Sequence, residues 1–189
     1  MVYIFLADGF EDIEAIAPLD IMRRANIDVK TVGVTDVSVT SGNGLIVQAD
    51  ILLEDLTLDN CEMLVLPGGR GGFAILDQSQ PVHEFILKAN DLGIMIAAIC
   101  GAPAILAKLG LLKNRRAVCF PSVEHILKSN GALIQRDEAV THDNYIITAQ
   151  AAGSSLEFGF KLVSMLRGWN AAEDVRKNIF YDNRKRNLT

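Results

Sequence analysis

An apolar segment of strand length, residues 94–99, ends abruptly at Cys100, which is followed by glycine, alanine and proline. Apolar side chains then recur at helical spacing over residues 102–109, so the stretch predicts a strand, a sharp turn and a helix. In a nucleophile elbow, the reactive side chain lies on such a turn, beside the positive end of the following helix. The pattern predicts that Cys100 lies at this turn with a lowered thiol pKa, which favours a nucleophile or a redox sensor. The alternative is a small buried residue that ends a core strand.

Similar strand-like and helix-like segments alternate along most of the chain. Continuous apolar runs are typical of parallel strands that are covered on both faces. Their alternation with helical patterns predicts an α/β fold, with a doubly wound, mostly parallel sheet and helices on both faces. The other main strands are expected at residues 2–7, 27–34, 62–66, 115–120 and 145–149, and the other main helices at residues 10–24, 81–90, 123–128, 156–167 and 171–177.

A Gly-Asn-Gly sequence separates residues 37–40 from residues 45–47. Glycine adopts the positive φ that tight hairpin turns require, so this segment predicts a β-hairpin. We expect the hairpin to cover an edge of the sheet or to form part of a subunit contact.

Composition indicates one folded domain over residues 1–189. Half of the 189 residues are hydrophobic and 22% are charged, which is enough apolar material for a substantial core. The net charge of -5 argues against nucleic acid or an anionic membrane as the main partner. The basic residues Arg184, Lys185 and Arg186 fall in a tail, about residues 180–189, that is expected to fray.

Cysteine usage indicates a reducing compartment. Cys61, Cys100 and Cys119 make an odd number and show neither CxxC nor Cys/His metal spacing, so free thiols and no metal site are expected. The N-terminus has no signal-peptide pattern, and no segment approaches the length of a membrane span. A cytoplasmic location is predicted.

Glu14 interrupts the first helical pattern. It follows Ile13 and lies three or four positions from Phe10 and Ala17, on or beside the apolar stripe. A carboxylate there is unfavourable unless it is paired, hydrogen-bonded or protonated. The alternative is an acid of the first turn that interacts only with the helix dipole.

The strand at residues 62–66 continues into a glycine-rich stretch that begins at Pro67. Gly69, Gly71 and Ala74 match the relaxed dinucleotide fingerprint, but the match lies off the first βα turn, a proline interrupts the region of the expected helix, and no ribose-binding acid follows. No cofactor is therefore predicted. Instead, the amides of Gly68 and Gly69 are expected to form an oxyanion-binding nest beside Cys100, because carboxyl ends of parallel strands meet at one crevice.

Four segments together carry a family resemblance: residues 6–14, 64–69, 97–103 and 148–158. In order and spacing, they resemble the ThiJ/PfpI superfamily, and within it the branch of the parkinsonism-associated deglycase. The resemblance implies a flavodoxin-like fold and a homodimer, with the first helix and the hairpin in its interface. It implies that Cys100 is the reactive, easily oxidised cysteine, that Glu14 hydrogen-bonds its sulfur, and that Gly69 and Gly101 supply backbone donors.

One position departs from this pattern. Several members carry a His-Pro pair beside the cysteine, whereas this chain has Phe120 followed by proline. Phe120 cannot act as a base, so Glu14 is expected to carry the proton transfer. His125 is a candidate proton relay, although a lone surface histidine is more commonly just solvated. His83 and His142 have weaker claims.

The residues and the resemblance together favour a cysteine-dependent enzyme that acts on small reactive carbonyls or glycated side chains, as a glyoxalase or deglycase does. A second interpretation is an oxidative-stress sensor or chaperone-like protein that works through oxidation of Cys100. A third is an intracellular protease-like or amidase-like hydrolase, which the phenylalanine at position 120 disfavours.

Overall fold

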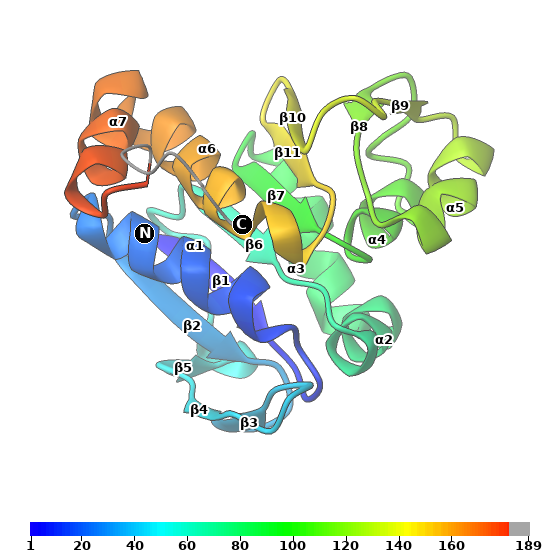
Figure 1. Cartoon of the computed structure of the whole chain (residues 1–189). Coiled ribbons are helices and arrows are strands. Elements are labelled where there is room, and N and C mark those ends of the chain that lie inside the picture. Colours follow the sequence, from blue (N-terminus) through cyan, green and yellow to red (C-terminus); the bar gives the residue numbers. More distant parts are fainter. Residues whose placement is uncertain (182–189) are drawn as a thin grey trace.

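A computed structural model describes residues 1–181 of the chain (Figure 1). Its centre is a seven-stranded sheet in which every neighbouring pair is parallel except β10 and β11. In spatial order, the strands are β10 (Val140–Asp143), β11 (Ile146–Ala149), β7 (Met95–Ile99), β6 (Met63–Leu66), β1 (Val2–Leu6), β2 (Val29–Gly33) and β5 (Ile51–Leu52). The inner order β2-β1-β6-β7-β11 is that of flavodoxin-like folds, which confirms the predicted fold class.

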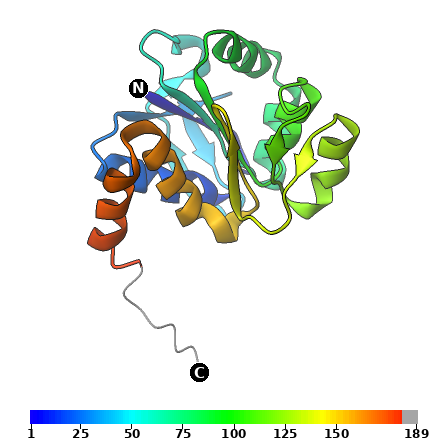
Figure 2. The ribbon, with the colours of Figure 1, turned by 90° about the horizontal axis from the view of Figure 1, so that it is seen from above.

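Helices cover both faces of the sheet (Figure 2), with the blue and orange helices on one side and the green helices on the other. The first group packs on a core cluster that contains residues of β1, β6 and β7, and the second group packs on a separate cluster on the opposite face. The first group consists of α1 (Asp12–Arg24), α6 (Ser155–Arg167) and α7 (Trp169–Asn178), and the second of α2 (Arg70–Gln78), α3 (Gln80–Asp91), α4 (Pro103–Lys108) and α5 (Glu124–Ser129).

Strand β1 shows why the apolar runs are continuous. Successive side chains of a strand point to opposite faces of the sheet. Val2, Ile4 and Leu6 enter the core beneath α1 and α6, whereas Tyr3 and Phe5 enter the core beneath α3 and α4. Since both faces are buried, no position of the strand is left for a polar residue.

The smaller elements lie around this sheet. The predicted hairpin is confirmed, because β3 and β4 pair in antiparallel fashion. Its tip is held to the start of α1, where Asp12 accepts hydrogen bonds from Ser41 Oγ at 2.6 Å and Asn43 Nδ2 at 2.8 Å. The smaller elements are β3 (Ser38–Thr40), β4 (Ile46–Gln48), η1 (Leu53–Asp55), β8 (Arg116–Ala117), η2 (Pro121–Val123), β9 (Leu133–Ile134) and η3 (Ala152–Ser154).

Helix α2 occupies part of the stretch that was expected to be a glycine-rich loop. A Cβ at Gly71 would lie 2.8 Å from the carbonyl oxygen of Asp8, and a Cβ at Gly72 would lie 2.8 Å from Phe10 Cα. These glycines therefore let the helix approach the β1–α1 connection closely. A helix in which glycine serves close packing cannot be distinguished from a loop by propensity alone.

Other differences are local. The strand expected at residues 115–120 is reduced to β8, which pairs with β9 in a small sheet of its own. Most of the tail predicted to fray, including Arg184, Lys185 and Arg186, lies outside the described residues. Among the helices described over residues 1–181, none combines the length and the apolar character needed to cross a membrane.

Candidate active site

Cys100 occupies a tight turn between β7 and α4. Its φ is +65°, in the left-handed region that side chains other than glycine rarely adopt. Two backbone hydrogen bonds hold the turn: the Cys100 amide donates to Ala149 O at 3.0 Å, and the Phe120 amide donates to Cys100 O at 2.8 Å. The predicted strand, turn and helix are thus present, with the cysteine at the strained position.

Glu14 lies on the buried face of α1. Its exposed fraction is 0%, whereas the neighbouring Ile13 is 49% exposed, so the apolar stripe is rotated relative to the sequence prediction. Glu14 Oε2 accepts a hydrogen bond from the Gly68 amide at 2.9 Å. Among residues 1–181, no hydrogen bond of standard geometry reaches Glu14 Oε1, but the Cys100 thiol and the Ala152 backbone lie close enough to the carboxyl to favour its charged form. The ionisation of this buried carboxyl therefore depends on a few neighbouring donors, of which the thiol is one.

Gly68 brings the acid and the thiol together. A Cβ added to this glycine would lie 2.6 Å from Glu14 Oε2, 2.7 Å from Cys100 Cβ and 3.1 Å from Cys100 Sγ. The absence of a side chain at Gly68 therefore allows both residues to contact the same short piece of backbone. The Gly68 amide is already bonded to Glu14, so it is not available for the oxyanion-binding role that was predicted for it.

The two side chains influence one another's ionisation. Burial raises the pKa of Glu14 from its ordinary 4.5 to about 7, against the opposing effects of Cys100 and the Gly68 amide. Burial, followed by the negative charge of Glu14, raises the pKa of Cys100 to about 12, although the amides of Gly69 and Gly101 favour the thiolate. The predicted lowering of the thiol pKa is therefore wrong. The following helix begins at Pro103, which has no N–H to offer, and the two amides do not outweigh burial beside a carboxylate.

A cavity of about 430 Å³ opens over these residues. Its lining includes the acid, the thiol and two of the expected backbone donors, which are Glu14, Cys100, Gly69 and Gly101. Apolar side chains, further charged side chains and the loop after a strand complete the lining. The apolar wall is made by Phe73, Phe120 and Val123, the charged groups are Glu11 and Arg70, and the loop that follows β11 contributes residues 151–153.

Comparisons with known proteins agree with this architecture. The family model described as DJ-1/PfpI matches residues 1–165. The chain belongs to this family.

Individual members of the DJ-1/PfpI family align over almost the whole chain. Protein dj-1beta of Drosophila melanogaster is 31% identical over 177 residues, which cover 93% of this chain and 94% of the relative. Its crystal structure superposes with a TM-score of 0.90 at 30% identity, covering 95% of this chain and 96% of that one. A protein of Thermococcus kodakarensis named a deglycase is 29% identical and covers 88% of this chain and 99% of the relative. The structure of Toxoplasma gondii DJ-1, described as oxidized, has a TM-score of 0.89 at 27% identity, with 96% and 98% coverage.

In this DJ-1/PfpI protein, the histidines lie away from the cavity lining. His125 is exposed on α5, His83 lies on α3, and His142 lies on β10. Phe120 does line the cavity and is 42% exposed. No contact therefore supports His125 as a proton relay.

Sequence reasoning missed Phe73, Arg70 and the loop at residues 151–153 as parts of the site. Residues 151–153 carried a usable signal, because they follow β11 at the carboxyl edge of the sheet where the other site loops meet. Phe73 carried none, since its role depends on α2. A Cβ at Gly101 would lie 3.2 Å from Phe73 Cγ, so the ring packs against the elbow.

The other two cysteines also have free thiols. Burial raises the pKa of Cys61 to about 11 and that of Cys119 to about 12. Within residues 1–181, no group of three or more His, Cys, Asp or Glu side chains is arranged to hold a metal ion.

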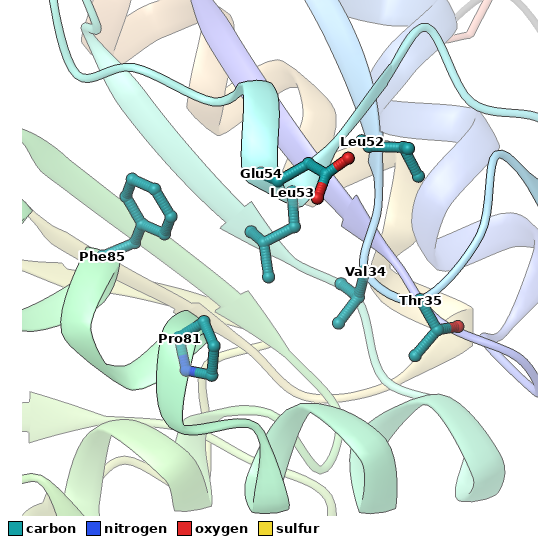
Figure 3. Close-up of a pocket in the computed structure, with 7 residues that line it drawn as sticks. All are labelled: Val34, Thr35, Leu52, Leu53, Glu54, Pro81 and Phe85. Carbon is teal, nitrogen blue, oxygen red and sulfur yellow. The ribbon is translucent and has the colours of Figure 1, made fainter.

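A second cavity, of about 410 Å³, lies between α3 and the segment from β5 to η1 (Figure 3). Glu54 is the one ionisable side chain in its lining, and it is exposed. Without a buried acid or a nucleophile, this cavity lacks the chemistry of the Cys100 cavity. It is lined by Val34, Thr35, Leu52, Leu53, Glu54, Pro81 and Phe85.

Proposed function

We propose that this protein is a cysteine-dependent enzyme that acts on small reactive carbonyls or on their adducts with side chains, as glyoxalases and deglycases do. The observation that carries the proposal is the buried Glu14 carboxyl beside Cys100, in a cavity large enough for a small substrate. The relative named a deglycase, at 29% identity over 88% of this chain, adds support.

The pKa values of Cys100 and Glu14 indicate which of them would donate a proton and which would accept it. A thiol with a pKa of about 12 is protonated near neutral pH, so it needs a base when it attacks. Glu14, with a pKa of about 7, is ionised in a substantial fraction of molecules and is close enough to accept the proton. Glu14 therefore acts as a general base in this proposal, which replaces a preformed thiolate.

For methylglyoxal, the proposed steps balance as a net hydration to lactate. A bond forms between Cys100 Sγ and the aldehyde carbon, the thiol proton passes to Glu14, and the amides of Gly69 and Gly101 stabilise the oxyanion of the hemithioacetal. Glu14, after releasing its first proton to the oxyanion, takes the proton from the former aldehyde carbon, which gives an enediolate. It returns this proton to the neighbouring carbon, while the hydroxyl proton passes from the first oxygen to the oxygen on that neighbouring carbon, so that a thioester of lactate is formed. Water then cleaves the resulting thioester and releases lactate and the free thiol.

Turnover of methylglyoxal to lactate without added thiol tests this proposal. Wild type and Cys100→Ser are compared at equal concentrations of folded protein, with Cys119→Ser as the matched control. Activity that is lost in the first variant and kept in the second supports the proposal. Activity in Cys100→Ser, or none in a wild-type sample with reduced Cys100, contradicts it.

A second candidate function is a redox sensor that works through oxidation of Cys100. The observation in its favour is the same thiol beside a carboxyl that can hydrogen-bond a sulfinate, together with a relative whose structure is described as oxidized. Mild peroxide followed by peptide mass spectrometry tests it. Selective oxidation of Cys100 supports the sensor, and equal oxidation of Cys61 and Cys119 argues against it.

We also propose that the protein is a homodimer that uses α1 and the β3–β4 hairpin. Ile13, Leu45 and Ile46 are 49%, 48% and 64% exposed, and the bonds from Asp12 to the hairpin tip hold these elements together. Exposed apolar side chains on two elements that are bonded to each other support this proposal. Sedimentation equilibrium should give the dimer mass for wild type and a lower mass for Ile46→Lys; a monomeric wild type contradicts the proposal.

A further inference from the structure

Two aromatic side chains stand beside the candidate nucleophile. Phe120 is joined to the elbow by the hydrogen bond from its amide to Cys100 O, and its side chain is 42% exposed along the cavity. Phe73 packs against the elbow at Gly101. A large apolar side chain that is exposed inside a reactive cavity is a surface to which a ligand can bind.

The cavity is larger than the smallest carbonyl substrates require. Methylglyoxal occupies on the order of 100 Å³, about the volume of three or four water molecules. The cavity measures about 430 Å³, so most of it remains for a substituent on the carbonyl. The volume alone does not define that substituent, but the chemistry of the wall does.

The charges along the cavity give little preference for an ionic substituent. Apart from Glu14, which takes part in the reaction and whose charge would repel an anionic substituent, the charged residues are Glu11 and Arg70. These two have opposite charge, and Arg70 is exposed to solvent. In contrast, Phe73, Phe120 and Val123 offer an apolar wall whose interaction with a ring is not weakened by solvent screening. The wall therefore favours apolar substituents, and aromatic ones above all.

We propose that Phe120, supported by Phe73, selects carbonyl compounds that carry an aromatic or similarly bulky apolar group, and is thus a specificity-determining residue. The inference rests on the proposed function of the same site. Phenylglyoxal represents the substrate class: it takes up water and gives mandelate, as methylglyoxal gives lactate, through the same bond to Cys100 and the same proton transfers at Glu14. In the hemithioacetal, the phenyl group lies against Phe120.

Initial rates with phenylglyoxal and methylglyoxal test this preference. The ratio of kcat/KM for the two substrates should fall about tenfold in Phe120→Ala and recover partly in Phe120→Leu, which restores apolar bulk. Leu92→Ala is the matched control, because Leu92 is also an apolar residue and is 60% exposed. It lies just before the N-terminal end of β7, whereas Cys100 follows the C-terminal end of that strand. The Leu92→Ala variant should keep the wild-type ratio. Phe120 is partly exposed, so the alanine variant is expected to fold.

Alkylation of Cys100 separates this inference from the proposed function, because it requires no turnover. N-phenylmaleimide and N-ethylmaleimide both add the Cys100 thiol across the same double bond and differ only in the group that would contact the aromatic wall. The ratio of their rates at Cys100, followed by peptide mass spectrometry, should exceed the ratio at a small-molecule thiol and should fall about tenfold in Phe120→Ala.

Each outcome decides the inference. If neither carbonyl compound is turned over but Phe120→Ala still lowers the maleimide ratio, the aromatic selection stands and the proposed reaction is wrong. If both compounds are turned over and neither ratio changes in Phe120→Ala, the reaction stands and the specificity role of Phe120 is overturned. A wild type without preference for the phenyl compounds in either assay also overturns it.

Discussion

Cys100 is half-buried and Cys119 is buried, but both have thiol pKa values of about 12 and each lies near one glutamate. The difference is in the acids. Glu14, beside Cys100, has an exposed fraction of 0%, and burial raises its pKa to about 7. Glu124, beside Cys119, forms ion pairs with Lys128 and Arg136, and hydrogen bonds from these side chains lower its pKa to about 2. In the proposed mechanism, what distinguishes the two thiols is therefore a neighbouring acid that can accept a proton near neutral pH.

The largest effect is expected from Glu14→Gln. The amide keeps an oxygen for the hydrogen bond from Gly68 but cannot accept the proton of Cys100. Removing a general base typically costs about 10²–10⁴-fold in rate, so turnover of the carbonyl substrate should fall by that factor. Steady-state kinetics at neutral pH measures the loss, and circular dichroism checks that the fold is retained. Turnover within a few-fold of wild type would show that the buried acid does not distinguish the two cysteines.

The second effect is on the pH dependence of stability. The folded-state pKa of Glu14 is raised from 4.5 to about 7, so the folded protein binds the proton more tightly than the unfolded chain does. The stabilisation is complete below pH 4.5 and is lost as the pH rises through 7, which amounts to about 3 kcal/mol of unfolding free energy. Urea denaturation of wild type and Glu14→Gln at pH 4.5, 6 and 8 measures it.

Comparison with Glu14→Gln separates the contribution of Glu14 to the pH dependence of stability from the contributions of other ionisable groups. The lowered pKa values of Glu62 and Glu124 affect stability below pH 4.5, where the stability they contribute is lost as the pH falls. Burial lowers the pKa of His142, which changes stability in the opposite direction near pH 6.5. Wild type and Glu14→Gln share these terms, and Gln does not titrate. The unfolding free energy of wild type should therefore fall relative to that of Glu14→Gln, by about 3 kcal/mol, as the pH rises from 4.5 to 8. A constant difference across this range would contradict a raised Glu14 pKa.

A third effect is expected from Gly68→Ala. The new Cβ would lie 2.6 Å from Glu14 Oε2 and 2.7 Å from Cys100 Cβ, so the acid and the thiol must move apart. Overpacking of this kind costs about 1–3 kcal/mol of unfolding free energy. Gly153→Ala is the control, since a Cβ there meets nothing within 4 Å. Equal urea midpoints for the two variants would show that Gly68 does not hold the pair together.

The sequence predicted the sheet well and the site only in part. The apolar runs identified β1, β6, β7 and β11, because strands that are buried on both faces tolerate few polar residues. The turn at Cys100 and the unfavourable position of Glu14 were also visible, since each breaks a local pattern. Helix α2 could not be predicted from the sequence, because glycines such as Gly71 and Gly72 are unfavourable in a helix unless the helix packs closely on another segment.

Ionisation was the least predictable property of the site. The pattern around Cys100 suggested a lowered thiol pKa, which considered only the helix that follows the turn. The raised value depends on burial and on Glu14, which is 86 positions away in the chain and reaches the thiol only through the tertiary fold. Local sequence describes the dipole near a group, whereas desolvation depends on everything that packs around it.

The smallest effect is expected from Glu124→Gln, the counterpart of Glu14→Gln at the other cysteine. Glu124 is charged near neutral pH and already holds Lys128 and Arg136, so it has no proton to exchange and its change should leave turnover within about twofold of wild type. Kinetics of both glutamine variants under one set of conditions makes the comparison direct. A loss in Glu124→Gln as large as that in Glu14→Gln would mean that charge near a cysteine matters more than the burial of its acid. Loss in Glu14→Gln alone would place the reactive chemistry in the pair whose acid is buried.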